Sequence, residues 1–596
     1  MPTITDNGRT GTADLPGSPL ELTELTSRLV RIMGTWNERQ WREISGQDFA
    51  LVDRTSLGMA FSEFAMRWMS NPVQVWSDLG KLAGDHIRLA TEFASTTAEA
   101  GKDRLASDRR FSAPAWSESP AARYLAAAHR VNEDWSAAVA RNVEGLDRHA
   151  QAKVSFFTRQ FMSAVAPSNW PLANPQVAKR STAENGANLV RGLRHLVEDL
   201  ERAEGRFAPN MTQETEFRVG GNLATTPGKV VYRNDLMEII HYEPTTATQY
   251  ARPLMIVPPW INKFYIFDLK PDNSFIRYML DQGHAVLLVS WVNPDERHAD
   301  KTFDHYMEEG FLTALDVVCR VTGAPEVNVL GFCIGGILTT AALAWLAGNG
   351  DRRIVSATLL ASMVDLTDAG EIMVFVDESQ VRSIEQHAAA NGYLAGYYLA
   401  DMFSMLREKD LIWSFVVNNY LLGRDPPPFD LLYWNSDATR LPGKMLSWYL
   451  RRIYLENDLV KPDCLEVHGR KLDLTRVTTP TFSVATKDDH IAPWRSCYAV
   501  TQHFRGPVTF VLGGSGHIAG IVNPPAKGKY GYWTRDDHPA DPDAWLAGAS
   551  RAEGSWWPLW AQWMERHGGE RNALYRPCAG GVNSLGEAPG TYVLAR

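Results

Sequence analysis

Cys333 is the residue whose sequence surroundings most clearly suggest a nucleophile. It lies in the run Gly331-Phe332-Cys333-Ile334-Gly335-Gly336, after a strand predicted at Val327–Leu330 and before a helix predicted at Gly335–Leu346. Strand, sharp turn and helix in this order are the context of a nucleophile elbow, here with cysteine in place of serine. Flanking glycines permit the turn, and the amino end of the helix favours a thiolate. The alternative is a buried cysteine in a glycine-rich turn, but the position between strand and helix favours catalysis.

A histidine after the last predicted strand of the sheet could act as the general base. The strand Val508–Leu512 runs into Gly513-Gly514-Ser515-Gly516-His517, a glycine turn that presents the histidine. Of the 15 histidines, His517 alone follows the last strand on such a turn. A structural role is the alternative. As a base, His517 would take the proton of the nucleophile and so activate it.

An aspartate between Cys333 and His517 is expected to orient the histidine. Asp489 follows the predicted strand Thr481–Ala485, and nucleophile, acid and histidine then occur in the usual chain order for an elbow enzyme. Its neighbour Asp488 is expected to face solvent. Asp365, after the preceding strand, is the rival acid. Whichever carboxylate serves would hold the imidazole tautomer and stabilise the imidazolium.

Two backbone N–H groups are expected to form an oxyanion hole. One belongs to Ile334, the residue after the nucleophile, and the other to the loop Pro258-Pro259-Trp260-Ile261-Asn262. Because proline has no N–H, the donor in this loop should be Trp260 or a residue just beyond it.

Short apolar strands alternate with helices after about residue 215. A hairpin is predicted from Lys229–Tyr232 and Met237–Tyr242. The further predicted elements are strands at 254–257, 284–291, 327–330, 354–361, 481–485 and 508–512, and helices at 274–282, 304–322 and 335–346. Such alternation predicts a parallel sheet covered on both faces. With the elbow, it indicates an α/β-hydrolase fold with a cap inserted at about 365–477, where aromatic residues and prolines break the pattern.

Residues 1–215 are predicted to form an α-helical amino-terminal domain, and residues 216–596 the catalytic domain. Apolar residues recur at helical spacing over four stretches, 20–33, 59–93, 119–161 and 185–202. A loose segment, Gly205 to Thr215, marks the expected boundary. The helical region is either a bundle without chemistry or, through apolar residues such as Trp68 and Trp76, a surface for a partner. The sequence leaves both interpretations open.

Composition limits the class of protein. The 596 residues carry a net charge of -9, which gives no reason to expect nucleic acid as a partner. Five scattered cysteines suit a reducing cytoplasm with a reactive thiol. The first residues lack the pattern of a secretory signal, and the longest apolar run is too short for a transmembrane segment. We expect a cytoplasmic enzyme with no metal and no cofactor.

Seven motifs resemble those of the polyhydroxyalkanoate synthases, from about Arg180 to the end of the chain. The motif at Cys333 is one of them. The others are Pro-Pro-Trp-Ile-Asn-Lys (258–263), Ser-Trp-Val-Asn-Pro-Asp (290–295), Asp-Asp-His-Ile-Ala-Pro-Trp (488–494), Ser-Gly-His-Ile-Ala-Gly (515–520), Ile-Val-Asn-Pro-Pro-Ala-Lys (521–527) and Gly-Ser-Trp-Trp-Pro-Leu-Trp (554–560). The length and the helical amino-terminal region are similar to class I, the poly-3-hydroxybutyrate synthases. The region before about Ser119 matches poorly.

The resemblance implies an acyltransferase that polymerises short-chain (R)-3-hydroxyacyl-CoA into polyester and releases CoA. It also implies a cytoplasmic homodimer attached to polyester granules, with granule-associated proteins as possible partners and a cap that must open. His490 and Arg407 would line the CoA channel, although Arg407 could equally belong to a surface ion pair. A thioesterase or polyester depolymerase with the same triad is the first alternative. A catalytically inactive granule protein is the second.

Overall fold

The computed structural model describes residues 19–44, 49–95, 105, 107–581 and 583–596. The chain divides into two compact units, and each is described by itself. The helical unit comprises Met1–Asp48, Leu57–Thr212 and Arg407–Pro427. The sheet unit comprises Phe49–Ser56, Gln213–Leu406 and Pro428–Arg596.

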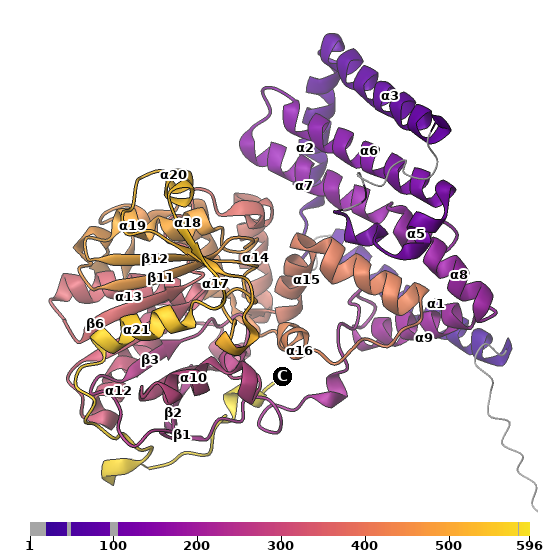
Figure 1. Ribbon diagram of the computed structural model, residues 1–596. Coiled ribbons are helices and arrows are strands. Elements are labelled where there is room, and N and C mark those ends of the chain that lie inside the picture. Colours follow the sequence, from indigo (N-terminus) through magenta and orange to yellow (C-terminus); the bar gives the residue numbers. More distant parts are fainter. Residues whose placement is uncertain (1–18, 45–48, 96–104, 106, 582) are drawn as a thin grey trace, which may run out of the picture. The chain divides into compact units, whose positions relative to one another are not determined.

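The sheet unit is built on a mixed sheet that has ten strands within the described residues, in the order β1-β2-β4-β3-β5-β6-β11-β12-β13-β14 (Figure 1). The six strands from β4 to β12 run parallel, and antiparallel strands flank them at both ends. The bounds are β1 Gly228–Arg233, β2 Met237–Tyr242, β3 Leu254–Val257, β4 Val286–Trp291, β5 Val327–Phe332, β6 Ile354–Leu360, β11 Thr481–Thr486, β12 Val508–Gly513, β13 Tyr532–Thr534 and β14 Ser550–Ala552.

The central strands are buried on both faces, as parallel strands generally are. Every residue of β3, β4, β5 and β11 is buried. Helix α13 (Ile334–Asn349) packs on β5, whereas α10 (Phe275–Asp281) and α21 (Trp557–His567) share one core with the strands. Helix α12 (Thr313–Thr322) contacts β3 and β5. The carboxyl ends of the parallel strands are therefore held firmly in place.

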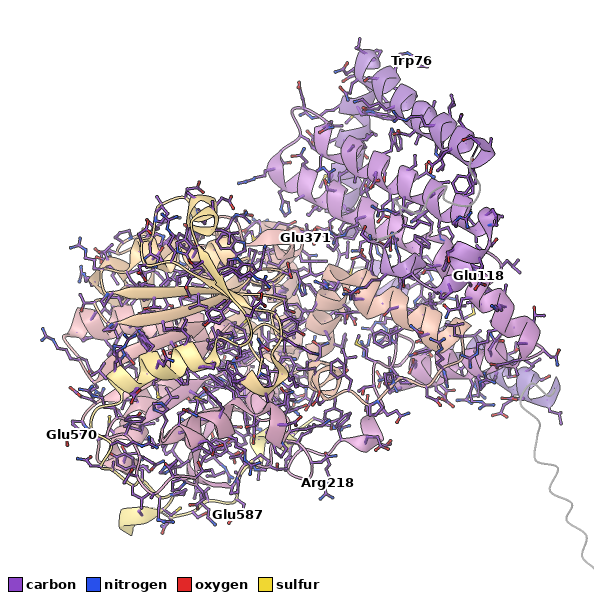
Figure 2. The ribbon with its side chains drawn as sticks, viewed as in Figure 1. Trp76, Glu118, Arg218, Glu371, Glu570 and Glu587 are labelled. Carbon is purple, nitrogen blue, oxygen red and sulfur yellow. The ribbon has the colours of Figure 1, made fainter. Side chains whose placement is uncertain are left out.

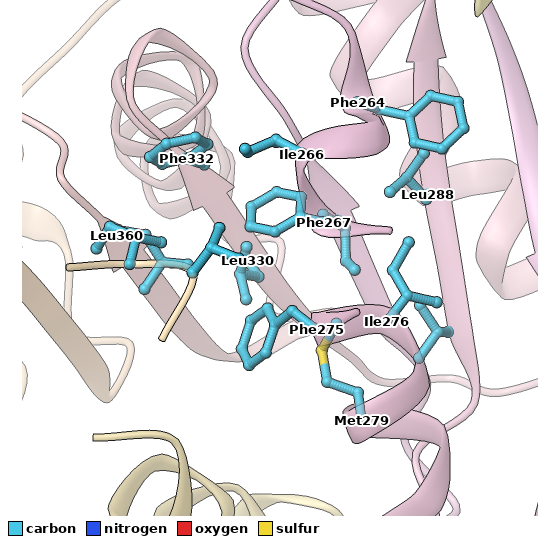
Figure 3. Close-up of a cluster of buried hydrophobic side chains, with 14 of the residues drawn as sticks. Phe264, Ile266, Phe267, Phe275, Ile276, Met279, Leu288, Leu330, Phe332 and Leu360 are labelled. Carbon is cyan, nitrogen blue, oxygen red and sulfur yellow. The ribbon is translucent and has the colours of Figure 1, made fainter. Parts of the chain in front are cut away.

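The core of the sheet unit is continuous and rich in aromatic side chains. Figure 3 shows part of it, where Phe267, ahead of α10, lies with the strand residues Leu330 and Phe332, and Phe264 lies beside Leu288 of β4. Burial of each such side chain contributes about 1.5–3 kcal/mol relative to exposure. This core lies directly beneath the turn that follows β5, and so supports the residue at position 333.

The described part of the helical unit consists mainly of α-helices of 5 to 26 residues (Figure 1). Neighbouring pairs in contact include α3 with α6, α6 with α7, and α1 with α9. The bounds are α1 Pro19–Ile44, α2 Arg54–Met69, α3 Pro72–Ser95, α5 Pro114–Glu118, α6 Pro120–Asn142, α7 Arg148–Ala164, α8 Pro175–Ala183 and α9 Ala187–Arg202. Between α2 and α3, Pro72 starts a new helix at its first position, so the helical region expected at 59–93 is two helices.

The segment Arg407–Pro427 returns to the helical unit from the middle of the expected cap. It contains two π-helical stretches, Lys409–Trp413 and Val416–Leu421. Gly192 of α9 lies so close to the carbonyl of Tyr420 that a Cβ at that position would overlap it. The Tyr420 hydroxyl donates a hydrogen bond to Asp199 at 2.8 Å. Close packing of this kind makes the segment part of the helical unit.

The predicted hairpin and strands of the sheet unit are confirmed, with ends that shift by one or two residues. The helix expected at 304–322 is α11 (Phe303–His305), a π-helical stretch at Tyr306–Leu312 and then α12. The rest of the expected cap contains α14 (Glu378–Asn391), α15 (Gly396–Leu406), α16 (Asp430–Ser436) and α17 (Gly443–Tyr449). Strands β13 and β14 are short and partly exposed, and the sequence pattern did not indicate them.

Candidate active site

Cys333 occupies a sharp turn between β5 and α13. Its φ of +53° and ψ of -123° are unusual for a residue with a side chain, and a strained turn of this kind defines a nucleophile elbow. A Cβ at Gly335 would overlap the carbonyl oxygens of Val257 and Pro258, and one at Gly331 would overlap Thr339. The glycines on both sides are therefore required by close backbone approach, as the sequence predicts.

His517 and Asp489 form a buried hydrogen-bonded pair. The distance from His517 Nδ1 to Asp489 Oδ2 is 2.7 Å. The other oxygen of Asp489 accepts hydrogen bonds from the backbone N–H groups of Ile491 at 2.9 Å and Ala492 at 2.8 Å. The Thr486 hydroxyl donates to Oδ2 at 3.2 Å. These donors fix the carboxylate, which in turn fixes the imidazole and leaves its Nε2 for a second partner.

Cys333 is that second partner. Burial lowers the pKa of His517, but the charges of Asp489 and Cys333, together with hydrogen bonds to both, raise it to about 10. The imidazole ring also stacks on Phe332, with 5.4 Å between the ring centroids. The structure thus places a histidine that Asp489 orients beside the Cys333 thiol, the arrangement by which a general base activates a nucleophile.

The loop expected to supply the second oxyanion donor lies against the elbow. The backbone carbonyls of Val257 and Pro258, at the start of this loop, lie so close to Gly335 that they leave no room for a side chain there. The carbonyl of Trp260 accepts a hydrogen bond from the Thr439 hydroxyl, and the indole packs on Tyr306 at 4.7 Å between centroids. Ile334 is the first residue of α13, where helix N–H groups lack intrahelical partners. Ile334 directly follows Cys333, and the loop that carries Trp260 begins against the elbow at Pro258.

The other carboxylates named from the sequence are engaged elsewhere. Asp488 is exposed to solvent. Asp365 accepts hydrogen bonds from the Thr367 backbone and hydroxyl and from Asn457, and it lies 3.7 Å from His503. The structure therefore brings Asp489 and not Asp365 to His517.

His490 and Arg407 lie in different units. His490 is half-buried and directly follows Asp489 in the sheet unit. Arg407 belongs to the helical unit, where its guanidinium forms an ion pair with Asp410 at 2.7 Å. The ion pair expected as the alternative role of Arg407 is therefore present.

Three residues that the sequence did not single out lie near enough to Cys333 to feel its charge. Tyr449 and Tyr454 are buried, with ring centroids 5.6 Å apart, and burial together with the nearby charge of Cys333 raises the pKa of both phenols. Burial, Asp489 and Cys333 raise the pKa of the Cys497 thiol. Neither tyrosine belongs to a recognisable motif, whereas Cys497 follows the motif at 488–494 by three residues.

An elbow nucleophile at the end of a central strand, with an acid-oriented histidine after a later strand, defines an α/β-hydrolase-fold acyl-transfer enzyme. Within the described residues no group of three or more His, Cys, Asp or Glu could hold a metal ion. No helix in the described part of the chain is long and apolar enough to cross a membrane.

Comparison with known proteins places the chain within this class. The family model for the "alpha/beta hydrolase fold" matches residues 255–524, and the model for "Poly-beta-hydroxybutyrate polymerase (PhaC) N-terminus" matches residues 107–279. The "Poly(3-hydroxyalkanoate) polymerase subunit PhaC" of Rhizobium meliloti is 45% identical over 90% of this chain and 88% of its own. The "Poly(3-hydroxyalkanoate) polymerase" of Methylorubrum extorquens is 43% identical over 97% of this chain and 92% of its own. The "Poly(3-hydroxyalkanoate) polymerase subunit PhaC" of Cupriavidus necator is 42% identical over 82% of this chain and 83% of its own. The chain belongs to the poly(3-hydroxyalkanoate) polymerase family.

Proposed function

We propose that this chain, an acyltransferase of the polyhydroxyalkanoate pathway, joins short-chain (R)-3-hydroxyacyl groups from CoA thioesters through an acyl-enzyme on Cys333. The observation that carries the proposal is the buried pair of Asp489 and His517 at 2.7 Å, with Cys333 on the strained elbow beside it. Its relatives are named as polymerases of 3-hydroxyalkanoates, which supports this chemistry over other acyl transfers.

The first half of the cycle transfers the acyl group to the enzyme. The Cys333 thiolate attacks the thioester carbonyl, and the backbone N–H groups of Ile334 and Trp260 stabilise the negative charge on its oxygen. The tetrahedral intermediate collapses, the bond to the CoA sulfur breaks, and the His517 cation gives its proton to the departing thiolate. One thioester is exchanged for another, so this step is nearly neutral in energy.

The second half forms the ester bond. Once Cys333 is acylated its negative charge is gone, and the pKa of His517 falls because that charge helped to raise it. Neutral His517 then removes the proton from the 3-hydroxyl of an acceptor, which attacks the acyl-enzyme. Cys333 leaves as the thiolate and the polyester is one unit longer. The site needs no cofactor for either step.

The finer features of the proposal concern the substrate channel and the partners. His490, next to the triad, and Arg407 would contact CoA. A homodimer in the cytoplasm at the surface of polyester granules fits the apolar side chains that α1 to α3 expose, such as Trp36, Trp41 and Trp76. Granule-associated proteins are further candidate partners of this surface.

The product distinguishes a polymerase from a thioesterase, since both would release CoA at the same triad. Purified protein with 3-hydroxybutyryl-CoA should release CoA and form an insoluble polyester that stays with the protein and scatters light. Acyl-CoA without the 3-hydroxyl should acylate Cys333 and stop. Free 3-hydroxy acid that accumulates in step with CoA, without polymer, would instead establish the thioesterase activity.

A further inference from the structure

The helical unit contains a cavity of about 880 Å³ whose lining includes none of the three triad residues. It is lined by the segment 107–113, by residues around the start of α8 and by the π-helical segment 407–418. All of its lining residues belong to the helical unit. The volume falls in the range of about 300–1,000 Å³ that is usual for sites of small molecules and cofactors.

Basic side chains predominate on the wall of this cavity. Five basic residues and two acidic residues line it, namely Arg109, Arg110, Arg130, Arg407 and Lys409, with Asp108 and Asp410. A concave surface that carries more positive than negative side chains attracts anions. The question is which of these cations are free to bind one.

Buried ion pairs neutralise the acidic groups and fix the wall. Arg110 donates to Asp108 at 2.7 Å and to Glu133 at 2.6 Å, and Lys409 donates to Glu133 at 2.6 Å. Burial raises the pKa of Glu133, but the charge of Arg110 and the bond from Lys409 outweigh it and lower that pKa to about 2. Glu133 is thus an ionised anchor for the cations of the wall.

Two guanidinium groups remain available to a ligand. Arg109 is exposed, and among the described residues it has no ion-pair partner. Arg407 is 40% exposed and uses Nε and Nη2 for Asp410, which leaves Nη1. A planar guanidinium matches the geometry of phosphate oxygens and can bind two of them at once. These two residues therefore favour a phosphate-bearing ligand.

Trp413 lines the same cavity and is half-buried, so part of its ring is accessible. A nucleobase gains about 1–3 kcal/mol from stacking on an aromatic side chain of this kind. We infer that the cavity binds a nucleoside phosphate, with its phosphate groups at Arg109 and Arg407 and its base against Trp413. The ligand is either a free nucleotide or the phosphorylated adenosine end of CoA, and the second identity rests on the contact between Arg407 and CoA in the proposed function.

Calorimetric titration of the full-length protein tests the inference. The probes are adenosine 3′,5′-bisphosphate, ATP and inorganic phosphate, titrated into wild type, Arg109→Ala, Arg109→Lys and Trp413→Leu. Arg109→Ala should lower the affinity for both nucleotides about tenfold, which corresponds to about 1.4 kcal/mol. Arg109→Lys should lower it by less. Trp413→Leu should lower the affinity for both nucleotides but leave the affinity for inorganic phosphate unchanged.

Lys179→Ala is the matched control, because Lys179 is an exposed cation of the same unit, paired with Glu118 and outside the cavity. If Lys179→Ala lowered the nucleotide affinity as much as Arg109→Ala does, the proposed binding site would be wrong. The absence of saturable nucleotide binding would also contradict the proposal. Competition by CoA, weaker for dephospho-CoA, identifies the CoA end as the ligand. ATP binding that CoA does not displace identifies a free nucleotide. Binding is measured without acyl substrate, so failure here leaves the polymerase proposal intact.

Discussion

The two units differ in how their interiors are held together. The sheet unit has a continuous core that runs from β1 to α21 and includes Phe267, Phe332 and Trp560. The described part of the helical unit instead has small separate clusters, such as the one around Val197 and the one around Trp116. Charged groups fill part of its interior, where Arg110 and Glu133 are 8% and 9% exposed.

On the outer surface, it is the helical unit that carries more of the exposed large apolar side chains. Helices α1 to α3 expose large apolar side chains, among them Trp76 at 74%, which Figure 2 labels. A rigid apolar core suits the positioning of a nucleophile, because a small displacement of reacting groups lowers the rate greatly. Exposed apolar surface suits association with a partner. From this comparison we expect chemistry to depend on the sheet unit and association on the helical unit, and the following predictions test that expectation.

Replacement of the nucleophile gives the largest expected effect. Cys333→Ala should lower CoA release by about 10⁴-fold or more, the scale seen when a triad nucleophile is removed. Cys333→Ser should also lose several orders of magnitude, because the site is arranged for a thiolate. Thermal melting should stay within a few degrees of wild type, since the side chain is small and not part of the core interior. Near-native turnover by the alanine variant would contradict the assignment.

Loss of the orienting acid should have the next largest effect. Asp489→Asn should slow polymer formation by about 10²–10⁴-fold, because the amide no longer fixes the tautomer or stabilises the His517 cation. Acylation should suffer less than ester formation, since a thiolate needs less help from a base than a hydroxyl does. Asp365→Asn is the control and should stay near wild type. Greater damage from the Asp365 variant would transfer the role of acid to the earlier strand.

Acid should destabilise the charged interior of the helical unit through His129 and Glu133. Burial and the nearby Arg110 lower the pKa of His129 to about 4 from 6.5. As the pH falls, the unfolded chain therefore binds this proton first, and stability is lost between about pH 6.5 and 4. Glu133 adds a second loss between about pH 4.5 and 2, because its pKa is also lowered in the folded chain. His241 and His284 of the sheet unit, whose pKa burial also lowers to about 4, contribute to the same window. His129→Asn should therefore reduce the first loss in melting curves recorded against pH without abolishing it. An unchanged curve would show that another group causes it.

A change on the exposed apolar surface should have the smallest effect on the purified enzyme. Trp76→Ser should leave melting and the initial rate of CoA release within about twofold of wild type, since surface changes usually alter stability by less than about 0.5 kcal/mol. Sedimentation with preformed polyester particles should fall, because an apolar contact is lost. Tyr530→Ser, an exposed aromatic of the sheet unit at 43%, is the control and should sediment as wild type does.

The catalytic turn could be read from the sequence because its requirements are local. Gly331 and Gly335 are needed where backbone segments touch, and both stand within two residues of Cys333. His517 was accessible for a similar reason, since it follows the last parallel strand on a glycine turn. Asp489 could be favoured over Asp365 from the motif, and the hydrogen bond to His517 shows which one is in place.

Contacts between distant segments could not be read in this way. Tyr420 packs on Gly192 of α9, a contact between residues far apart in the chain, and neither side shows a distinctive motif. The fold of the long insertion brings Tyr449 and Tyr454 near Cys333, and an isolated tyrosine in a sequence does not indicate its neighbours in the fold. Strands β13 and β14 were missed because three-residue strands with partly exposed side chains lack a clear alternation.

The return of residues 407–427 to the helical unit has a consequence for the order of events during synthesis. A chain emerges from the ribosome amino end first, and domains generally fold as units in that order. Here α9 is made long before Tyr420, its packing partner, and the strands from β1 to β6 are made in between. The helical unit therefore cannot complete its packing until much of the sheet unit has been synthesised. The surface of α9 around Gly192 therefore stays uncovered by its packing partner during this interval.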